Sequence, residues 1–313
     1  MGWEASIASG GENRKQGGEV LTEAAFKAIL PLPLPRTAVT LGGSAQPAHC
    51  NQPESLALIL PYRDRWENLV NLAHYLHPFL QRQQRNYTIY VVEQAGSELF
   101  NKGRLVNRAV VEILRRRPHT NCFIMHDVDL LPMNGGNLYR CLAGSPRHLS
   151  PAVSDFDFIQ PYEFLIGGVL AFQPLLFRSV NGFSNSFWGW GGEDDDLYFR
   201  FVAAGLKPAR PPPSVGRYWA QPHPRRDLHA NRYLTVGKRR AHLDGLNAVL
   251  HLTKLLSWEE KELWTHLRID VGTAPKRVCN ATHCNGHYLG PPLTNYTNTH
   301  TLPQPHILSL PSK

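Results

Sequence analysis

Apolar and polar positions divide the chain between residues 55 and 132 into short and long segments. Three short runs are apolar almost throughout, and two longer stretches between them repeat apolar side chains at helical spacing. The predicted strands are 56–62, 87–93 and 121–131, and the predicted helices are 66–84 and 98–117. Two strand–helix units followed by a third strand predict an α/β fold, with a mostly parallel central sheet flanked by helices.

The second half of the chain has a less regular pattern. We expect strands at 167–172 and 265–271, helices at 193–204 and 238–256, and a long loop at 208–231. Residues 1–50 are rich in Gly, Ser, Ala and Pro without apolar periodicity, which predicts a disordered tail or stem. The sequence therefore predicts one folded domain at 51–275, followed by an irregular tail at 276–313.

Functional side chains follow two of the predicted strands. Pro61, Arg63 and Arg65 come at the end of the first strand, and Asp127 and Asp129 come at the end of the third. Ligands of open α/β sheets bind beyond the carboxyl ends of the strands. We therefore expect these side chains to line one binding site.

The two aspartates can be interpreted in two ways. On a strand, a spacing of two residues turns Asp127 and Asp129 to the same side, where they can hold a hard divalent cation that bridges diphosphate oxygens. Alternatively, they are a pair of solvated acids at a strand end. Arg63 and Arg65 at the neighbouring strand end favour the metal site. His223 could complete its ligand shell, or it could be an ordinary surface histidine.

The segment WGWGGEDDD at 188–196 places two tryptophans and three glycines before four consecutive carboxylates. Acidic residues in a first helical turn are stabilised by the helix macrodipole by ~0.3–1 kcal/mol each, which explains one or two of them. A sugar acceptor needs a carboxylate that takes its hydroxyl proton and a flat face on which its ring can stack. The segment supplies both. Together with Asp127 and Asp129, it predicts a metal-dependent sugar transferase.

Composition and charge narrow the choice of partners. The chain has 33 Lys and Arg against 25 Asp and Glu, giving a net charge of +8, which suits a nucleotide diphosphate or nucleic acid. No block of five or six basic residues occurs, so we expect no nucleic-acid partner. No segment approaches the ~20 apolar residues that span a bilayer.

Five cysteines and three Asn-x-Ser/Thr sequons bear on the cellular compartment. One sequon lies between Cys279 and Cys284, and the combination favours an oxidising, secretory compartment. Cys279 and Cys284 could form a disulfide. They could instead bind zinc with His283 and His287, although this spacing fits no usual zinc pattern.

A series of motifs resembles the β-1,4-galactosyltransferases, which are Golgi inverting glycosyltransferases with a GT-A-type fold. The resemblance covers roughly residues 50–273 and keeps the order and spacing of the family. The motifs are LILPYRDR at 58–65, YLHPFLQRQQ at 75–84, IYVVEQAG at 89–96, FNKGRLVN at 100–107, HDVDLLPMN at 126–134, GGV at 167–169, FWGWGGEDDD at 187–196, DGLN at 244–247 and IDVGT at 269–273.

The resemblance implies a UDP-sugar site and a manganese cofactor. Asp129 and His223 would ligate the manganese, and Asp194 would be the base for the acceptor 4-hydroxyl, with Glu193 and Asp195 binding acceptor or donor. The implied donor residues are Pro61, Arg63, Arg65, Phe100, Lys102, Asp127, Val128, Leu165 and Trp190. The implied acceptor residues are Tyr162, Gly191, Gly192, Asp195, Arg232, Tyr233 and Val236. Cys122 and Cys141 match one family disulfide, and Cys50 matches half of another whose partner is missing.

The chain departs from the family pattern in three places. Ala220 replaces a methionine that usually shares the metal, which should weaken manganese binding. Leu165 replaces a tyrosine that restricts the donor to galactose, so N-acetylgalactosamine should also be admitted. The usual N-terminal membrane anchor is missing from this chain, so a soluble or secreted form is an alternative to a Golgi-anchored one.

The expected function is transfer of galactose or N-acetylgalactosamine from the UDP-sugar to the 4-hydroxyl of a terminal N-acetylglucosamine, in the Golgi lumen. One alternative is a weak or inactive family member that binds UDP or a glycan without turnover, a hypothesis motivated by Ala220 and the lost anchor. Another alternative, a two-metal nuclease, leaves the paired tryptophans unused.

Overall fold

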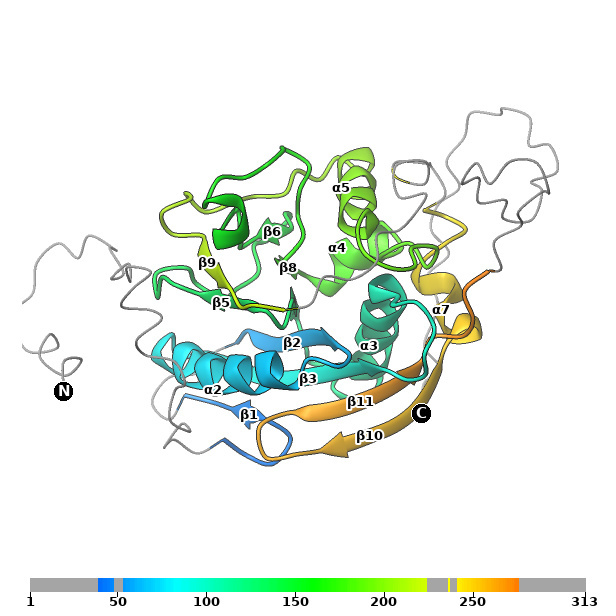
Figure 1. The fold of residues 1–313 in the computed structure, drawn as a ribbon, viewed down its shortest axis with the longest axis horizontal. Coiled ribbons are helices and arrows are strands. Elements are labelled where there is room, and N and C mark those ends of the chain that lie inside the picture. The colour runs from blue at the N-terminus through cyan, green and yellow to red at the C-terminus, as the bar shows by residue number, and fades with distance from the viewer. Residues whose placement is uncertain (1–38, 48–52, 224–235, 237–240, 276–313) are drawn as a thin grey trace, which may run out of the picture. The chain divides into compact units, whose positions relative to one another are not determined.

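The structure is a computed structural model, and it describes residues 39–47, 53–223, 236 and 241–275 (Figure 1). The chain divides into two compact units, Met1–Ala274 and Pro275–Lys313. Several residues singled out from the sequence lie outside the described residues, namely Cys50, Arg232, Tyr233, Cys279, His283, Cys284 and His287. The predictions for these residues, and for the parts of the two tails outside the described residues, therefore stay predictions.

An eight-stranded mixed sheet forms the centre of the first unit. Its strands follow the order β10-β11-β3-β2-β4-β8-β6, and β1 also pairs with β3. Their bounds are β1 Ser44–Ala45, β2 Ser55–Tyr62, β3 Asn86–Gln94, β4 Cys122–His126, β6 Arg147–His148, β8 Val169–Phe172, β10 Lys254–Glu260 and β11 Thr265–Asp270. The four strands β11, β3, β2 and β4 are parallel, whereas β1, β6, β8 and β10 pair in the antiparallel sense. The predicted α/β fold with a parallel centre is confirmed.

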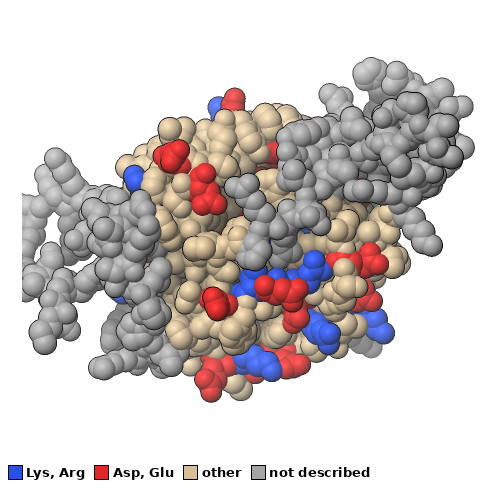
Figure 2. Space-filling model, in the orientation of Figure 1, with Lys and Arg blue, Asp and Glu red and all other residues tan. Residues whose placement is uncertain are grey.

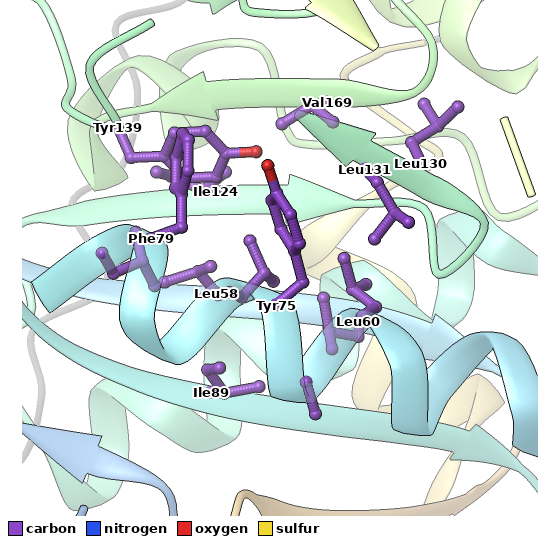
Figure 3. Packing of buried hydrophobic residues seen from close by; sticks show 14 of the residues in the cluster. Leu58, Leu60, Tyr75, Phe79, Ile89, Ile124, Leu130, Leu131, Tyr139 and Val169 are labelled. Carbon is purple, nitrogen blue, oxygen red and sulfur yellow. The ribbon is translucent and has the colours of Figure 1, made fainter. Parts of the chain in front are cut away.

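Helices cover both faces of the sheet because the central strands are apolar on both sides. In β2, Leu56, Leu58 and Leu60 pack into the core cluster that includes α2 (Trp66–Arg82), and Ala57 and Ile59 pack into the cluster that includes α3 (Lys102–Arg116). Figure 3 shows Tyr75 and Phe79 of α2 lying over the first of these faces. The result is a helix–sheet–helix sandwich.

Two further parts of the fold lie outside the central sheet, a smaller sheet and a group of three helices. A three-stranded sheet has the order β5-β9-β7, with β5 at Leu130–Pro132, β7 at Ala152–Val153 and β9 at Arg217–Ala220. Helices α4 (Pro174–Ser179), α5 (Glu193–Ala203) and α7 (Leu246–Leu252) complete the second part (Figure 1). None of the described helices combines the length and the hydropathy of a membrane span.

Three sequence predictions of secondary structure are wrong in instructive ways. Within the described part of the helix expected at 238–256, only Leu246–Leu252 is helical, and Lys254–Glu260 is the edge strand β10, whose backbone bonds to β11. The loop expected at 208–231 contains β9, which is held by β5 and β7. Ser44–Ala45, inside the predicted tail, forms β1 on β3. In each case a partner strand decides the structure: β11 follows β10 directly in a hairpin, whereas the partners of β9 and β1 lie far away in sequence.

Candidate active site

The two aspartates of the predicted metal site lie in a turn and not on a strand. Strand β4 ends at His126, Asp127 to Asp129 form the turn, and β5 begins at Leu130. The Leu130 amide donates to the Asp127 carbonyl at 3.3 Å, which closes the turn. The prediction of one strand at 121–131 is therefore wrong, and so is the alternation argument. The turn still leaves the aspartates at the carboxyl end of β4, where they were expected.

The ladder between β5 and β9 brings His223 to Asp129. Leu130 pairs with Ala220, and beyond this pair the Gln221 amide donates to the Asp129 carbonyl at 2.7 Å. Two residues later, Nε2 of His223 lies 2.9 Å from Oδ2 of Asp129. Two side chains 94 positions apart in the sequence are thus joined by an ordinary antiparallel pairing.

Charged partners surround Asp129. The guanidinium of Arg65, just beyond β2, donates to the Asp129 carboxylate at 2.6 Å. Burial favours the neutral carboxyl, but the hydrogen bond with His223 and the charge of Arg65 outweigh it and lower the pKa of Asp129. Asp129 is therefore a carboxylate at neutral pH, as a metal ligand must be.

The donor atoms of Asp129 and His223 fit a divalent cation. Adjacent ligands of an octahedral ion with bonds of about 2.1 Å lie about 3.0 Å apart, and the two atoms here are 2.9 Å apart. A carboxylate oxygen and an imidazole nitrogen are also a usual ligand pair for first-row divalent metals. Ala220 carries no side-chain donor atom, and its backbone amide donates to Ser154 Oγ at 2.9 Å.

Lys102 connects the aspartate turn to the carboxylate run. Its ammonium nitrogen lies 2.6 Å from Oδ1 of Asp127 and 3.7 Å from Oε1 of Glu193. Although burial opposes ionisation, these two acids raise the pKa of Lys102 above its ordinary value. The two acidic motifs, more than sixty residues apart in the sequence, therefore lie on either side of one buried cation.

Burial changes the acidity of both partners of Lys102. It raises the pKa of Asp127, an effect that the Lys102 ammonium opposes and that the carboxylates of Asp129 and Asp194 increase. It also raises the pKa of Glu193 to about 7, again against Lys102 and with a contribution from Asp194. Raised and lowered carboxyl pKa values thus occur within one cluster, which is common at catalytic sites.

Helix α5 presents the carboxylate run. Gly191 and Gly192 both have positive φ, so the chain enters the helix through a left-handed turn that suits glycine. Glu193 to Asp196 then occupy the first turn, where the helix macrodipole favours them. Asp196 makes a buried ion pair with Arg200 at 2.7 Å, and Asp194 and Asp195 are also buried.

Asp194 lies against the segment that leads into β8. A Cβ atom added to Gly167 would come within 2.7 Å of Oδ2 of Asp194, and Cδ1 of Leu165 would lie 3.7 Å from the same point. The carboxylate and the Leu165 side chain therefore flank one stretch of glycine backbone. Since any side chain at position 167 would collide with the carboxylate, this glycine is required for the approach.

Two of the residues expected to hold the nucleotide, Arg63 and Phe100, contact each other. Arg63 lies over the Phe100 ring with 5.6 Å to its centroid, and it donates to the Glu98 carbonyl at 2.6 Å. Pro61 is the last but one residue of β2, and Val128 is buried in the aspartate turn. Pro61 and Arg63 therefore lie at the carboxyl end of β2, and Phe100 lies between the adjacent parallel strand β3 and helix α3.

The remaining predicted site residues are more exposed. The Trp190 side chain is 52% exposed, next to Gly189, whose amide donates to the Phe100 carbonyl at 2.8 Å. Tyr162 is 39% exposed and lies 4.5 Å from Phe164, measured between ring centroids. Val236 is half-buried.

Sequence reasoning missed the residues that hold the aspartate turn from behind. Gln221 donates to the Val128 carbonyl at 3.1 Å and to the Asn68 carbonyl at 3.3 Å. Asn71 of α2 donates to the Gln221 side chain at 3.1 Å, and Asn68 donates to the Pro222 carbonyl at 3.2 Å. Amide side chains on a helix are ordinarily solvated, so only their contact with a distant loop marks them as part of the site.

A disulfide and the surface charge complete the setting. Cys122 and Cys141 are bonded, as the family resemblance implied, so strand β4 is tied to the segment after the aspartate turn. Figure 2 shows Lys and Arg interleaved with Asp and Glu on the face it displays. The described basic side chains on that face are therefore not gathered into one continuous band.

Comparison with known proteins finds similarity to galactosyltransferases along most of the chain. Residues 24–142 match the N-terminal region of glycosyl transferase group 7, and residues 147–224 match the N-terminal domain of galactosyltransferase. The chain is 40% identical to beta-1,4-galactosyltransferase 1 of Bos taurus over 240 residues, 75% of this chain and 59% of that protein. It is 42% identical to beta-1,4-galactosyltransferase 3 of Homo sapiens over 240 residues, 75% of this chain and 60% of that protein. It thus spans about three-fifths of the length of these relatives.

Solved structures give the same result. The catalytic domain of Drosophila β1,4-galactosyltransferase 7, in complex with xylobiose, matches with a TM-score of 0.61 and 29% identity, over 70% of this chain and 94% of that one. An Asp-to-Asn mutant of the same enzyme, in complex with manganese, UDP-Gal and xylobiose, matches with a TM-score of 0.59 and 28% identity, with the same coverage.

Proposed function

Because the chain belongs to glycosyltransferase group 7, the β-1,4-galactosyltransferase family, and has the GT-A fold, we propose that it is an inverting hexosyltransferase. It transfers galactose or N-acetylgalactosamine from the UDP-sugar to the 4-hydroxyl of a terminal N-acetylglucosamine. The observation that carries this proposal is the position of Lys102, whose ammonium touches both Asp127 and Glu193 and so ties the two acidic motifs into one site.

The nucleotide end of the proposed site consists of cations and an aromatic ring. Arg63 and Phe100 already contact each other, and Arg65 lies against Asp129. Their charge and ring face suit a uridine diphosphate. When bound by Asp129 and His223, manganese would supply positive charge to the diphosphate as it leaves.

The acceptor end of the proposed site contains the base. Asp194 accepts the proton of the acceptor 4-hydroxyl while that oxygen bonds to C1 of the donor sugar. At the same time, the bond from C1 to the UDP oxygen breaks, and its electron pair leaves with UDP. A single displacement of this kind inverts C1. Because residue 167 is a glycine, it places no side chain between the Asp194 carboxylate and the proposed position of the sugar.

Two observations support the choice of donor and compartment. Leu165, beside Asp194, is smaller than tyrosine and lacks its hydroxyl, so it leaves room for the acetamide of N-acetylgalactosamine. The Cys122–Cys141 disulfide suits an oxidising compartment, as the lumen of the Golgi is. We therefore include both UDP-sugars and a luminal location in the proposal.

The proposal is tested by turnover of the purified chain. With manganese, UDP-galactose or UDP-N-acetylgalactosamine and a chitobiose acceptor, the protein should release UDP in proportion to acceptor glycosylated. Xylobiose, the ligand of the matched Drosophila structures, is the second acceptor to include. UDP binding without release of UDP from any donor–acceptor pair would favour the alternative of a binding protein, in which Ala220 leaves the metal too weakly held for turnover.

A further inference from the structure

The backbone between Glu163 and Gly167 belongs to no strand of either sheet: Glu163 and Phe164 lie in a turn, and Leu165 to Gly167 have no regular secondary structure. Backbone carbonyls of such a segment need other partners, because a buried carbonyl without one is costly. Here the carbonyls of Glu163, Leu165 and Gly167 all accept hydrogen bonds from side chains. The donors come from two distant segments of the chain, namely His148 and Arg210.

Arg210 makes two of these contacts, and a third hydrogen bond to His148, with one guanidinium. Its Nη2 donates to the Glu163 carbonyl and, at 3.2 Å, to the Leu165 carbonyl. Its Nε donates to Nδ1 of His148 at 3.3 Å. The planar fork of arginine provides several donors in fixed directions, which a lysine ammonium does not.

The His148 ring links Arg210 to the Gly167 carbonyl through two hydrogen bonds. Since arginine can only donate, Nδ1 of His148 is the acceptor, so its Nε2 carries the hydrogen and donates to the Gly167 carbonyl at 3.0 Å. Burial and the charge of Arg210 lower the pKa of His148 to about 3, so the ring stays neutral. Ser150 Oγ also donates to this carbonyl, at 3.2 Å.

The segment 163–167, called the clamped segment below because Arg210 and His148 hold its carbonyls, passes beside Asp194 at Gly167. Leu165 lies in the middle of it, and both Leu165 and Asp194 approach the same point beside Gly167. A change in the backbone at 165 therefore moves the Leu165 side chain relative to the carboxylate. In the proposed function, this is where the transferred sugar lies.

We propose that Arg210, acting with His148, is a positioning residue that sets donor selectivity by fixing the backbone of Leu165 relative to Asp194. The inference rests on the proposed function, because it assumes that Leu165 faces the donor sugar. Arg210 donates to Glu163, Leu165 and His148, and none of these belongs to the proposed nucleotide end of the site. Its effect should therefore fall on the sugar and leave the uridine diphosphate unchanged.

The test compares Arg210→Lys and Arg210→Met with the parent chain by calorimetric titration with UDP, UDP-galactose and UDP-N-acetylgalactosamine in the presence of manganese. We expect the ratio of the two UDP-sugar affinities to change by roughly threefold to tenfold, the range that the net value of one hydrogen bond corresponds to. Affinity for UDP alone should stay within about twofold.

Arg147→Lys is the matched control. Arg147 is the neighbour of His148 in β6, and it donates to the Leu138 carbonyl at 2.5 Å, away from the clamped segment. It should change thermal stability without changing the donor ratio. Adding Leu165→Tyr to Arg210→Lys should give a donor ratio that differs from the product of the single effects, since Arg210 acts through position 165.

Hydrogen exchange of the ligand-free variants gives a second readout that needs no turnover. Amides at 165–168 should exchange at least tenfold faster in Arg210→Lys than in Arg147→Lys. If the donor ratio and the exchange are unchanged in folded Arg210 variants while the parent chain binds both UDP-sugars, the inference is overturned and the proposed function stands. If the parent chain binds neither UDP-sugar, the proposed function fails, and this inference fails with it.

Discussion

At the scale of single residues, the carboxylates of the site are paired with the cationic side chains of Lys102 and Arg65. Each aspartate contacts a cationic side chain at 2.6 Å: Asp127 contacts the Lys102 ammonium, and Asp129 contacts the Arg65 guanidinium. A buried carboxylate is tolerated only with such a partner. Glu193 lies farther from Lys102, at 3.7 Å, and it is the acid whose pKa rises to about 7. The acids of the site are therefore not equivalent.

The raised pKa of Glu193 makes the stability of the ligand-free protein depend on pH. The unfolded chain ionises Glu193 near its ordinary pKa of 4.5, and the folded chain does so only near 7. Stability from this group is therefore fully present below pH 4.5 and is lost as pH rises through 7. Relative to Glu193→Gln, the parent chain should lose up to ~3 kcal/mol of unfolding free energy over this range. Denaturant titrations at pH 4.5 to 8 measure this, and parallel pH profiles would contradict it.

Leu165→Tyr tests the assignment of donor choice to one side chain. A tyrosine adds a phenolic hydroxyl that can bond to the donor sugar and removes the space for an acetamide. One hydrogen bond is worth about 0.5–1.5 kcal/mol, so the ratio of transfer from UDP-galactose to transfer from UDP-N-acetylgalactosamine should rise roughly threefold to tenfold. Competition between the two donors in one reaction measures the ratio directly. An unchanged ratio in an active variant would show that position 165 does not face the sugar.

At the scale of elements, the sequence reveals the parallel centre of the fold but not the pieces added to it. Strands β2, β3 and β4 are apolar runs that stand out by themselves. Strand β9 could not be found in this way, because Arg217–Ala220 is short and mixed and depends on β5 and β7 for its hydrogen bonds. The contact between His223 and Asp129 depends on that strand. The pattern of apolar and polar residues therefore could not predict this contact.

The same limit explains which site residues could be predicted. Asp129 and Asp194 were found because their residue types and neighbours form motifs. Gln221 and Arg210 were missed, since an isolated amide or arginine has no local signal, and their function lies in backbone carbonyls far away in sequence. Family resemblance supplied the role of His223, which the residues alone had left open.

The Cys122–Cys141 disulfide should stabilise the fold at the element that carries the aspartate turn. It closes a loop with a sequence separation of 19. In the chain-entropy account, a loop of this size corresponds to about 3 kcal/mol. Replacing both cysteines by serine should lower the free energy of unfolding by about that amount, measured by denaturant titration. Under reducing conditions the difference should vanish, and a variant as stable as the oxidised parent would contradict the prediction.

At the scale of the whole molecule, the described unit is a sandwich with its chemistry beyond the carboxyl ends of the parallel strands (Figure 1). Arg65 after β2, Asp129 after β4 and His223 after β9 meet there, and α5 brings Asp194 from the other half of the chain. The rigid sheet positions the first group, and Lys102 links it to the second. One cluster thereby joins the two halves of the chain.

The most direct test of the account separates nucleotide binding from transfer. In Asp194→Asn, affinity for UDP with manganese should stay within about twofold of the parent, because the proposed role of Asp194 lies at the acceptor end of the site. The rate of transfer should fall by about 100-fold or more, the contribution of a general base. Asp196→Asn is the control, since Asp196 pairs with Arg200 and should affect stability but not transfer per folded molecule.

Calorimetry and a UDP-release assay on the same preparations of the parent chain and of Asp194→Asn decide the matter. The account predicts an unchanged affinity for UDP together with lost transfer. Equal losses of affinity and transfer, or full transfer without the Asp194 carboxylate, would contradict it.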